Sequence, residues 1–178
     1  MTPSYPRYIY FPRSSRPPDW VGDLVGAFRT HRSEIDTLAG RANTSNRVLA
    51  IVRPDLKAIG YEVEEKGGDI PRPVLFGEGG EMEKEYRIDA YHPGSRVVLE
   101  VEAGRGAKGN AVHRDLINMS LIVDAEYAAI AVPISYRYKQ KEEPKSEPAY
   151  EKHFLLLDAI YSSGRLKFPF DGIVLIGY

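Results

Sequence analysis

Three carboxylate side chains near the middle of the sequence have the residue types and spacing of a metal site. Glu100-Val101-Glu102 ends an apolar run, and Asp89 lies in the segment before it. Side chains at positions i and i+2 of a β-strand point to the same face, so Glu100 and Glu102 are expected to project together. Carboxylate oxygens are the ligands that hard cations such as Mg²⁺ prefer, at about 2.1 Å. The pattern therefore indicates acids that can share one divalent cation.

The contribution of Asp89 depends on how two predicted strands, 85–91 and 96–103, pair as a hairpin. If the hairpin is regular, Asp89 faces Val98 and is the diagonal neighbour of Glu100, about 7–8 Å away. Carboxyl groups at that separation can reach a common ion. A slip of one residue would instead move Asp89 to the other face of the sheet.

The same register raises an alternative in which the acids are structural. It sets Glu102 opposite Glu85. Like charges across a sheet repel each other, so this pair would need a cation or a basic side chain nearby. It also sets Glu100 opposite Arg87, which is the arrangement of an ordinary cross-strand salt bridge on a solvated surface. Residue types alone leave both interpretations open.

These residues resemble the motif of the PD-(D/E)xK nuclease superfamily. The motif consists of Arg87-Ile88-Asp89, a spacer of ten residues, and Glu100-Val101-Glu102. In that superfamily an Asp begins the second core strand, and an acid-x-Lys triplet ends the next. Glu102 stands where the Lys is usual, which is similar to a variant in some type II restriction enzymes, and Ile88 stands where Pro is common. The resemblance covers roughly residues 33–136.

The resemblance implies a restriction-endonuclease-like fold and Mg²⁺-dependent hydrolysis of DNA, with Mn²⁺ as a substitute ion. Asp89, Glu100 and Glu102 are then the expected metal ligands and catalytic residues, with Glu102 as general base or ligand. Lys108 is the nearest candidate to supply the charge of the missing lysine. A duplex cutter with one site per chain usually dimerises, so a homodimer is expected. The absent lysine also allows an inactive member of the same fold that binds nucleic acid or a protein.

A glycine-rich segment, 104–109, matches GxGxxG between a predicted strand and a predicted helix. The same pattern occurs in dinucleotide-binding folds, which gives a further alternative. Against it, the acids just before this segment would repel a pyrophosphate. In the nuclease interpretation, Arg105 and Lys108 would contact the DNA backbone, and Asn110 and His113 at the start of the next helix would contact phosphate or water.

Aromatic and basic residues alternate in two further segments. Residues 136–141 place Arg137, Lys139 and Lys141 among tyrosines, and residues 5–13 have a similar mixture. Such segments can follow a phosphate backbone and stack on bases. They can equally form a dimer arm or a hydrated loop.

Hydrophobic periodicity predicts the elements that must position these residues. Helices are expected over about 19–39, 45–60, 110–123 and 151–163, and strands over 61–65, 85–91, 96–103, 127–136 and 173–177. A loop rich in Gly, Pro and Glu is expected over 66–84. This order predicts an α/β fold with a mixed central β-sheet flanked by helices. Within residues 96–136, the strand–helix–strand unit predicts two parallel strands joined by a crossover helix.

Length and composition limit the remaining possibilities. The 178 residues are predicted to form a single domain, 1–178, with an extended N-terminal arm over 1–18 and an exposed charged loop over 137–150. The chain has no cysteine, which excludes disulfides and thiolate metal sites and suits a cytoplasmic protein. No apolar run approaches the ~20 residues that span a bilayer, so no membrane association is expected.

The charges are distributed unevenly along the chain. The net charge of −1 combines +4 over residues 1–53, −6 over 54–102 and +1 over 103–178. A general nucleic-acid coat protein would be basic throughout. An acidic centre between less acidic segments fits a protein that binds cations in the middle and phosphates at its edges, and it equally fits a mixed solvated surface.

Overall fold

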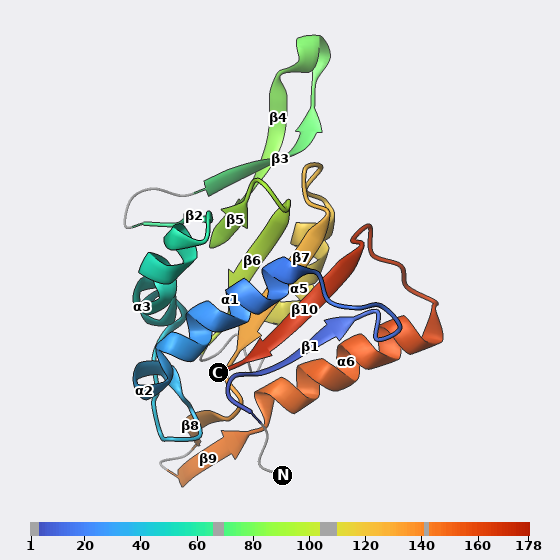
Figure 1. Cartoon of the computed structure of the whole chain (residues 1–178). Coiled ribbons are helices and arrows are strands. Elements are labelled where there is room, and N and C mark those ends of the chain that lie inside the picture. Colours follow the sequence, from blue (N-terminus) through green and yellow to red (C-terminus); the bar gives the residue numbers. More distant parts are fainter. Residues whose placement is uncertain (1–3, 66–69, 104–109, 141–142) are drawn as a thin grey trace.

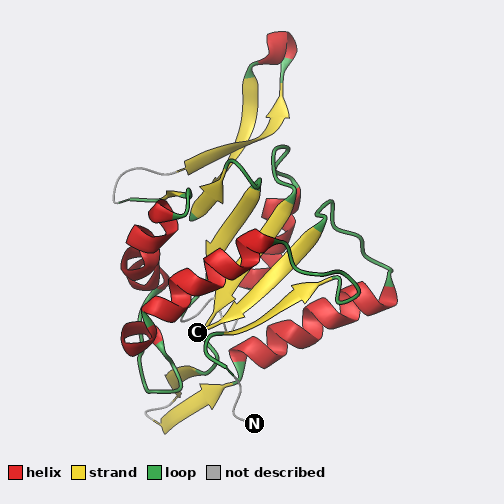
Figure 2. Ribbon diagram, viewed as in Figure 1, coloured by secondary structure: helices red, strands yellow, loops and turns green. Residues whose placement is uncertain are grey.

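The centre of the molecule is a mixed β-sheet with helices on both faces (Figures 1 and 2). The computed structural model describes residues 4–65, 70–103, 110–140 and 143–178. The sheet has six strands in the order β1-β10-β7-β6-β5-β2. Their bounds are β1 Arg7–Phe11, β2 Glu62–Val63, β5 Ala90–His92, β6 Val97–Val101, β7 Tyr127–Val132 and β10 Gly172–Gly177.

The helices that cover the sheet are α1 Asp19–Thr30, α2 Arg32–Ile35, α3 Ser45–Ala58, α5 Ala111–Ser120 and α6 Ala149–Ser163. The predicted helix over 19–39 is interrupted at His31, whose ring bonds to Asp55 of α3 at 2.6 Å. Along β6, Leu99 packs with α1 and α3, whereas Val98 packs with α5 and α6. Alternating strand side chains therefore fill two apolar layers, one on each face. No helix in the described ranges is both long and apolar enough to cross a membrane.

The strand directions explain why the sheet is mixed. Strands β2, β5 and β6 are successive antiparallel neighbours. The chain then crosses through α5 to β7, which lies parallel to β6 with Leu99 beside Ala129. Strand β10 is parallel to β7, and β1 closes the sheet as an antiparallel edge strand. The predicted mixed sheet with flanking helices, and the parallel pair within residues 96–136, are both confirmed.

Within the N-terminal segment predicted as an extended arm, residues 7–11 form β1 and are part of the sheet. This strand pairs with β10 from Arg7–Gly177 to Phe11–Ile173. Tyr10 packs into the layer beneath α1 and α3, and Phe11 packs into the opposite layer, where its ring stacks on Tyr161 at 5.3 Å. The two prolines nearest to the strand, Pro6 and Pro12, lie just outside it.

Two segments predicted as loops are β-hairpins that project from opposite ends of the molecule (Figure 1). The predicted charged loop over 137–150 contains β8 Tyr136–Gln140 and β9 Glu143–Glu147, and α6 already begins at Ala149. The predicted loop over 66–84 contains β3 Ile70–Phe76, the short 3₁₀ turn η1 Glu78–Gly80 and the start of β4 Met82–Ile88. Polar and proline residues suggested loops, but two-stranded hairpins outside the main sheet bury little and tolerate both.

One predicted strand is divided in the structure, and another ends earlier than expected. The strand over 85–91 is divided at Asp89 into the end of β4 and the whole of β5. The strand over 127–136 ends at Val132, because Pro133 has no N–H group to continue the ladder.

We predict that Phe11→Ala lowers the free energy of unfolding by about 3–5 kcal/mol, because it empties a fully buried aromatic site. Urea denaturation measures the loss. Tyr8→Ala is the matched control, since Tyr8 lies on the same strand with 44% of its surface exposed, and should change stability by about 1 kcal/mol or less. Equal small losses in both variants would show that β1 contributes little to the folded sheet.

Candidate functional site

Glu100 and Glu102 lie at the carboxyl end of β6, in the middle of the sheet. Glu100 is paired in parallel with Ile130 of β7, and Glu102 directly follows the last residue of β6. Leu99 and Val101 are buried in the layer formed with α1 and α3. Strand alternation therefore directs Glu100 toward the opposite face, which α5 covers. Both acids are half-buried, and 13% of the Glu102 side chain is exposed.

Asp89 occupies the bend between β4 and β5 and is tied to the end of β6. Its Oδ2 accepts a hydrogen bond of 2.7 Å from the N–H of Val101. Its own carbonyl accepts a 2.8 Å bond from the N–H of Glu64, which follows β2. The side chain and the backbone of Asp89 thus link three neighbouring strands at the point where the carboxylates gather.

Strands β5 and β6 pair two residues away from the predicted register. The observed partners are Ala90–Leu99, Tyr91–Val98 and His92–Val97. The turn holds four residues rather than two; within it, Ser95 N–H donates to the His92 ring at 2.9 Å and Arg96 has a φ of 54°. A shift of two residues keeps each side chain on its face. Continuing this ladder sets Asp89 opposite Glu100, so the expected facing of Asp89 and Val98 is wrong.

The cross-strand partners expected for the other acids are also wrong. Glu85 and Arg87 belong to β4, where they pair with Pro73 and Pro71 of the projecting β3–β4 hairpin. Arg87 lies 3.9 Å from Glu85 on its own strand. The ladder therefore places neither of them opposite Glu100 or Glu102, and the salt bridge that favoured a purely structural role does not follow from the sheet register.

A further acid, Asp115 of α5, joins this group and was not expected from the sequence. It is 5% exposed, and its Oδ1 accepts bonds of 3.0 Å from Nε and Nη2 of Arg114. Its buried Oδ2 has no hydrogen-bond donor within the described residues. Arg114 Nη2 also lies 3.8 Å from Oε1 of Glu102. The sequence feature that could have indicated Asp115 is its place within the apolar stripe of the crossover helix, which also contains Val112 and Leu116.

Burial and mutual repulsion raise the pKa values of the clustered acids. Burial, and then the neighbouring Asp115, raise the pKa of Glu102 to about 8. Burial is also the main reason that the pKa of Asp89 rises to about 6, with Glu64 and Asp115 contributing. Glu100 has a pKa well above its ordinary value, because of burial and then of Asp89 and Asp115. The group therefore favours a bound proton or cation over a full set of negative charges.

The fit of a divalent cation to these acids is partial. Within the described residues, no three His, Asp or Glu side chains are grouped so that they could hold a metal ion. The acids are close enough to shift one another's pKa, and an oxygen-only donor set with an unpaired buried oxygen on Asp115 suits Mg²⁺. Their carboxyl groups do not converge on one point, so shared binding requires side-chain rotation.

The backbone at the end of β6 is fixed by contacts from separate parts of the fold. The N–H of Glu102 donates to the carbonyl of Ala131 at 2.8 Å, and its carbonyl accepts a bond of 2.8 Å from the hydroxyl of Tyr178. The N–H of Ala103 donates to Oγ of Ser45, at the start of α3, at 2.9 Å. Strand β7, strand β10 and helix α3 thus hold the segment that carries the acids.

The remaining predicted site residues are divided between several places. Arg105, Lys108 and Lys141, together with the GxGxxG segment 104–109, lie outside the described residues. Asn110 precedes α5 and is exposed; its carbonyl accepts the N–H of Arg114 at 3.0 Å. His113 is exposed on α5 and borders a hollow formed with α6, on the side of α5 away from Asp115.

Arg137 and Lys139 are exposed on β8, so they are not in the acidic cluster itself. Arg137 lines a hollow next to Ala103, one residue beyond Glu102. Of these two predicted nucleic-acid contacts, Arg137 is therefore the one found beside the end of β6.

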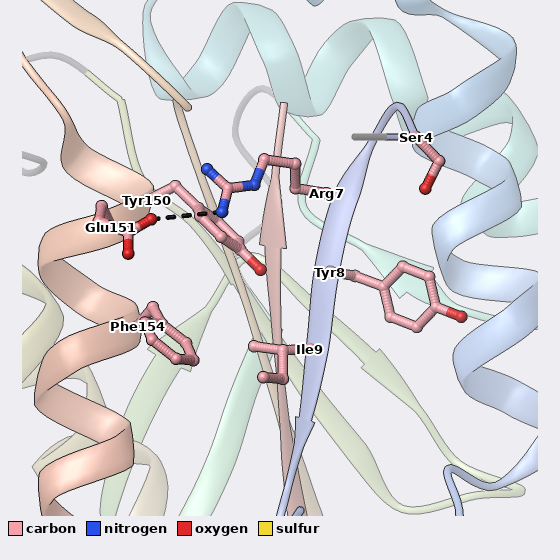
Figure 3. Close-up of a pocket in the computed structure, with 7 residues that line it drawn as sticks. All are labelled: Ser4, Arg7, Tyr8, Ile9, Tyr150, Glu151 and Phe154. Atoms are coloured by element: carbon pink, nitrogen blue, oxygen red, sulfur yellow. Dashed lines mark hydrogen bonds and ion pairs between the residues drawn. The ribbon is translucent and has the colours of Figure 1, made fainter. Parts of the chain in front are cut away.

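A separate hollow of about 330 Å³ lies between β1 and α6 (Figure 3). The Arg7 guanidinium lies 4.3 Å from the centre of the Tyr150 ring and 3.3 Å from Glu151. The two charged residues that line this hollow are thus paired with each other. The contacts attach β1 to α6, and the charge available for chemistry lies at the end of β6 instead.

Comparison of the sequence with models of known protein families and with curated proteins finds no match. The functional proposal therefore rests on the geometry and charge of the acidic cluster.

We predict that the metal-free protein becomes less stable relative to Glu102→Gln as the pH rises from about 4.5 to 8. The pKa of Glu102 is about 8 in the folded state, above the ordinary value of a glutamate. Between these two values the unfolded chain loses the proton while the folded chain keeps it, so rising pH favours unfolding. Melting temperatures in EDTA across this range measure the difference. Glu81→Gln, at an exposed position, is the control and should follow the wild type. Parallel curves for all three proteins would contradict the raised pKa.

Proposed function

We propose that this protein is a Mg²⁺-dependent DNA endonuclease with a restriction-endonuclease-like fold, and that it acts as a homodimer. The observation that carries the proposal is the crowding of four acids at the end of β6, namely Asp89, Glu100, Glu102 and Asp115. Crowded, partly buried carboxylates are typical of sites that bind divalent cations for phosphoryl chemistry.

The order of elements around the cluster supports the proposal. Helix α3 leads into the antiparallel strands β2, β5 and β6, and α5 then crosses to the parallel strand β7. Asp89 directly precedes the second of these antiparallel strands, and Glu100-Val101-Glu102 ends the third. These are the places that the acids occupy in the PD-(D/E)xK superfamily.

The proposed roles follow from the surroundings of each acid. Asp89 and Glu100 would hold the cation, because the β5–β6 ladder sets them opposite each other and Asp89 raises the pKa of Glu100. A bound cation would polarise the phosphate and lower the pKa of an attacking water. Glu102, with a pKa of about 8, can hold or release a proton near neutral pH, as a general acid or base must.

Arg114 supports the proposed activity despite the missing lysine. Its guanidinium contacts Asp115 and lies 3.8 Å from Glu102, while 66% of its side chain remains exposed. An arginine in this position can place a permanent positive charge beside a phosphate at the site. Arg114 is therefore a second candidate for the role assigned to Lys108.

The alternative proposal is a member of the same fold that binds nucleic acid or a protein without cutting it. Two observations favour this alternative. Glu102 replaces the usual lysine, and the described carboxyl groups do not converge on a common metal position. The two proposals differ in whether a divalent cation binds productively at Asp89 and Glu100.

We predict that Mn²⁺ or Mg²⁺ raises the melting temperature of the wild type at pH 8, where more of the clustered acids are ionised than at lower pH. The increase should be lost in Glu100→Gln, which removes one ligand charge but keeps the shape of the side chain. Glu81→Gln should retain the full increase, since this exposed acid lies in the β3–β4 hairpin. An equal increase in all three proteins would mean that the cation binds elsewhere.

We further predict that the wild type nicks or linearises supercoiled plasmid in the presence of Mg²⁺ or Mn²⁺ but not in EDTA. Asp89→Asn and Glu100→Gln should each lower the rate at least about 100-fold, because each removes a proposed metal ligand. Gel analysis of plasmid forms over time measures the rates, with Glu81→Gln as the active control. A folded wild type that leaves the plasmid intact with both ions would favour the non-cutting alternative.

A further inference from the structure

A small hollow adjoins the acidic cluster on the far side of the end of β6. It lies where three strands end, and is lined by Ala103 after β6, Pro133 after β7 and Tyr178 after β10. Strands β6, β7 and β10 run in the same direction, so their carboxyl ends meet at this edge of the sheet. In open α/β sheets, ligands bind at such an edge.

The wall of this hollow is basic, in contrast to the cluster beside it. Arg41 and Arg137 line it together with Asn43 and Ser135, and no acidic side chain is among the described residues that line it. Neither guanidinium forms an ion pair within the described parts of the chain. Two arginines without a carboxylate partner at one concave site can accept an anion.

The guanidinium of Arg137 lies against the turn that precedes α3. A Cβ atom on Gly40 would lie 3.2 Å from Nη1 of Arg137, so the guanidinium rests against the backbone of a glycine. Gly40 has a φ of 90°, which side-chain-bearing residues rarely adopt. Glycine at this position therefore allows both the turn before α3 and the close approach of Arg137.

The hollow is small. Its volume of about 40 Å³ exceeds what one water molecule needs. A compact oxyanion such as a phosphate group is the kind of ligand that two arginines at a small site bind. Because Ala103 is adjacent in sequence to Glu102, an anion in the hollow would lie directly beside the acids.

We propose that Arg41 and Arg137 bind a backbone phosphate of a nucleic acid, next to the phosphate that the acidic cluster would help to hydrolyse. The inference rests on the proposed function, because it assigns the substrate contact of the same site. Phosphate binding here would hold the nucleic acid against the end of β6, where crowded carboxylates alone would repel it.

The test compares the double variant Arg41→Gln/Arg137→Gln with the wild type. Fluorescence anisotropy with a labelled 20-base-pair duplex in EDTA measures binding without cleavage, over a series of salt concentrations. The double variant should bind about tenfold more weakly, and the slope of log K against log salt should fall by about 1, the value for one neutralised phosphate. Arg16→Gln/Arg165→Gln is the control, because it removes the same charge from exposed positions elsewhere.

The outcomes separate this inference from the proposed catalysis. Weaker binding and a smaller salt slope in the Arg41/Arg137 variant alone would support the phosphate site, even if the wild type cuts no plasmid. Equal behaviour of the two double variants, or a wild type that binds no duplex, would overturn it, whereas metal-dependent cleavage would still stand on Asp89 and Glu100. Unchanged melting temperatures would exclude misfolding as the cause of weaker binding.

Discussion

The burial of carboxyl groups around one strand end is the physical constraint on which the rest of the structure depends. Each buried carboxylate gives up hydration, and several of them together also repel one another. Within the fold, the N–H of Val101 donates a hydrogen bond to Asp89, and the guanidinium of Arg114 donates one to Asp115. These contacts do not neutralise the group, as the raised pKa values show. The cluster is held together by the surrounding fold despite its own repulsion.

The opposing charge lies on the other side of the same strand end. Glu102 and Ala103 are consecutive residues, yet one belongs to the acidic cluster and the other to a hollow with two arginines. Both residues follow Val101, the last residue of β6. Acidic and basic side chains therefore lie near the same strand end. Such an arrangement favours an anionic ligand on the arginine side.

Much of the central architecture could be predicted from the sequence, because its patterns are local. The apolar strands, the crossover helix and the shared face of Glu100 and Glu102 follow from periods of two and of about four residues. The pairing of Asp89 could not be predicted, since it depends on a four-residue turn stabilised by the His92 ring. The contribution of Asp115 required the packing of α5 on the sheet.

The errors at the periphery have a different cause. Strand β1 was hidden by flanking prolines, and its strand character becomes clear only when β10, more than 160 residues later, is its neighbour. The two hairpins were hidden by polar composition, which normally indicates loops. In both cases the backbone hydrogen bonds between strands decide the structure, and residue types report these bonds poorly.

The chain leaves the sheet after β2 and returns to it at β5, and these two strands are paired neighbours. Glu62 pairs with Tyr91 and Val63 with Ala90, so the two ends of the excursion lie one strand spacing apart. Arg72 connects these two strands, because it stacks on Tyr91 of β5 at 3.8 Å and pairs with Glu62 of β2. The entropy of closing such a loop grows only slowly with its length. The β3–β4 hairpin can therefore lengthen, shorten or change its tip during evolution while the register that positions Asp89 against β6 stays the same.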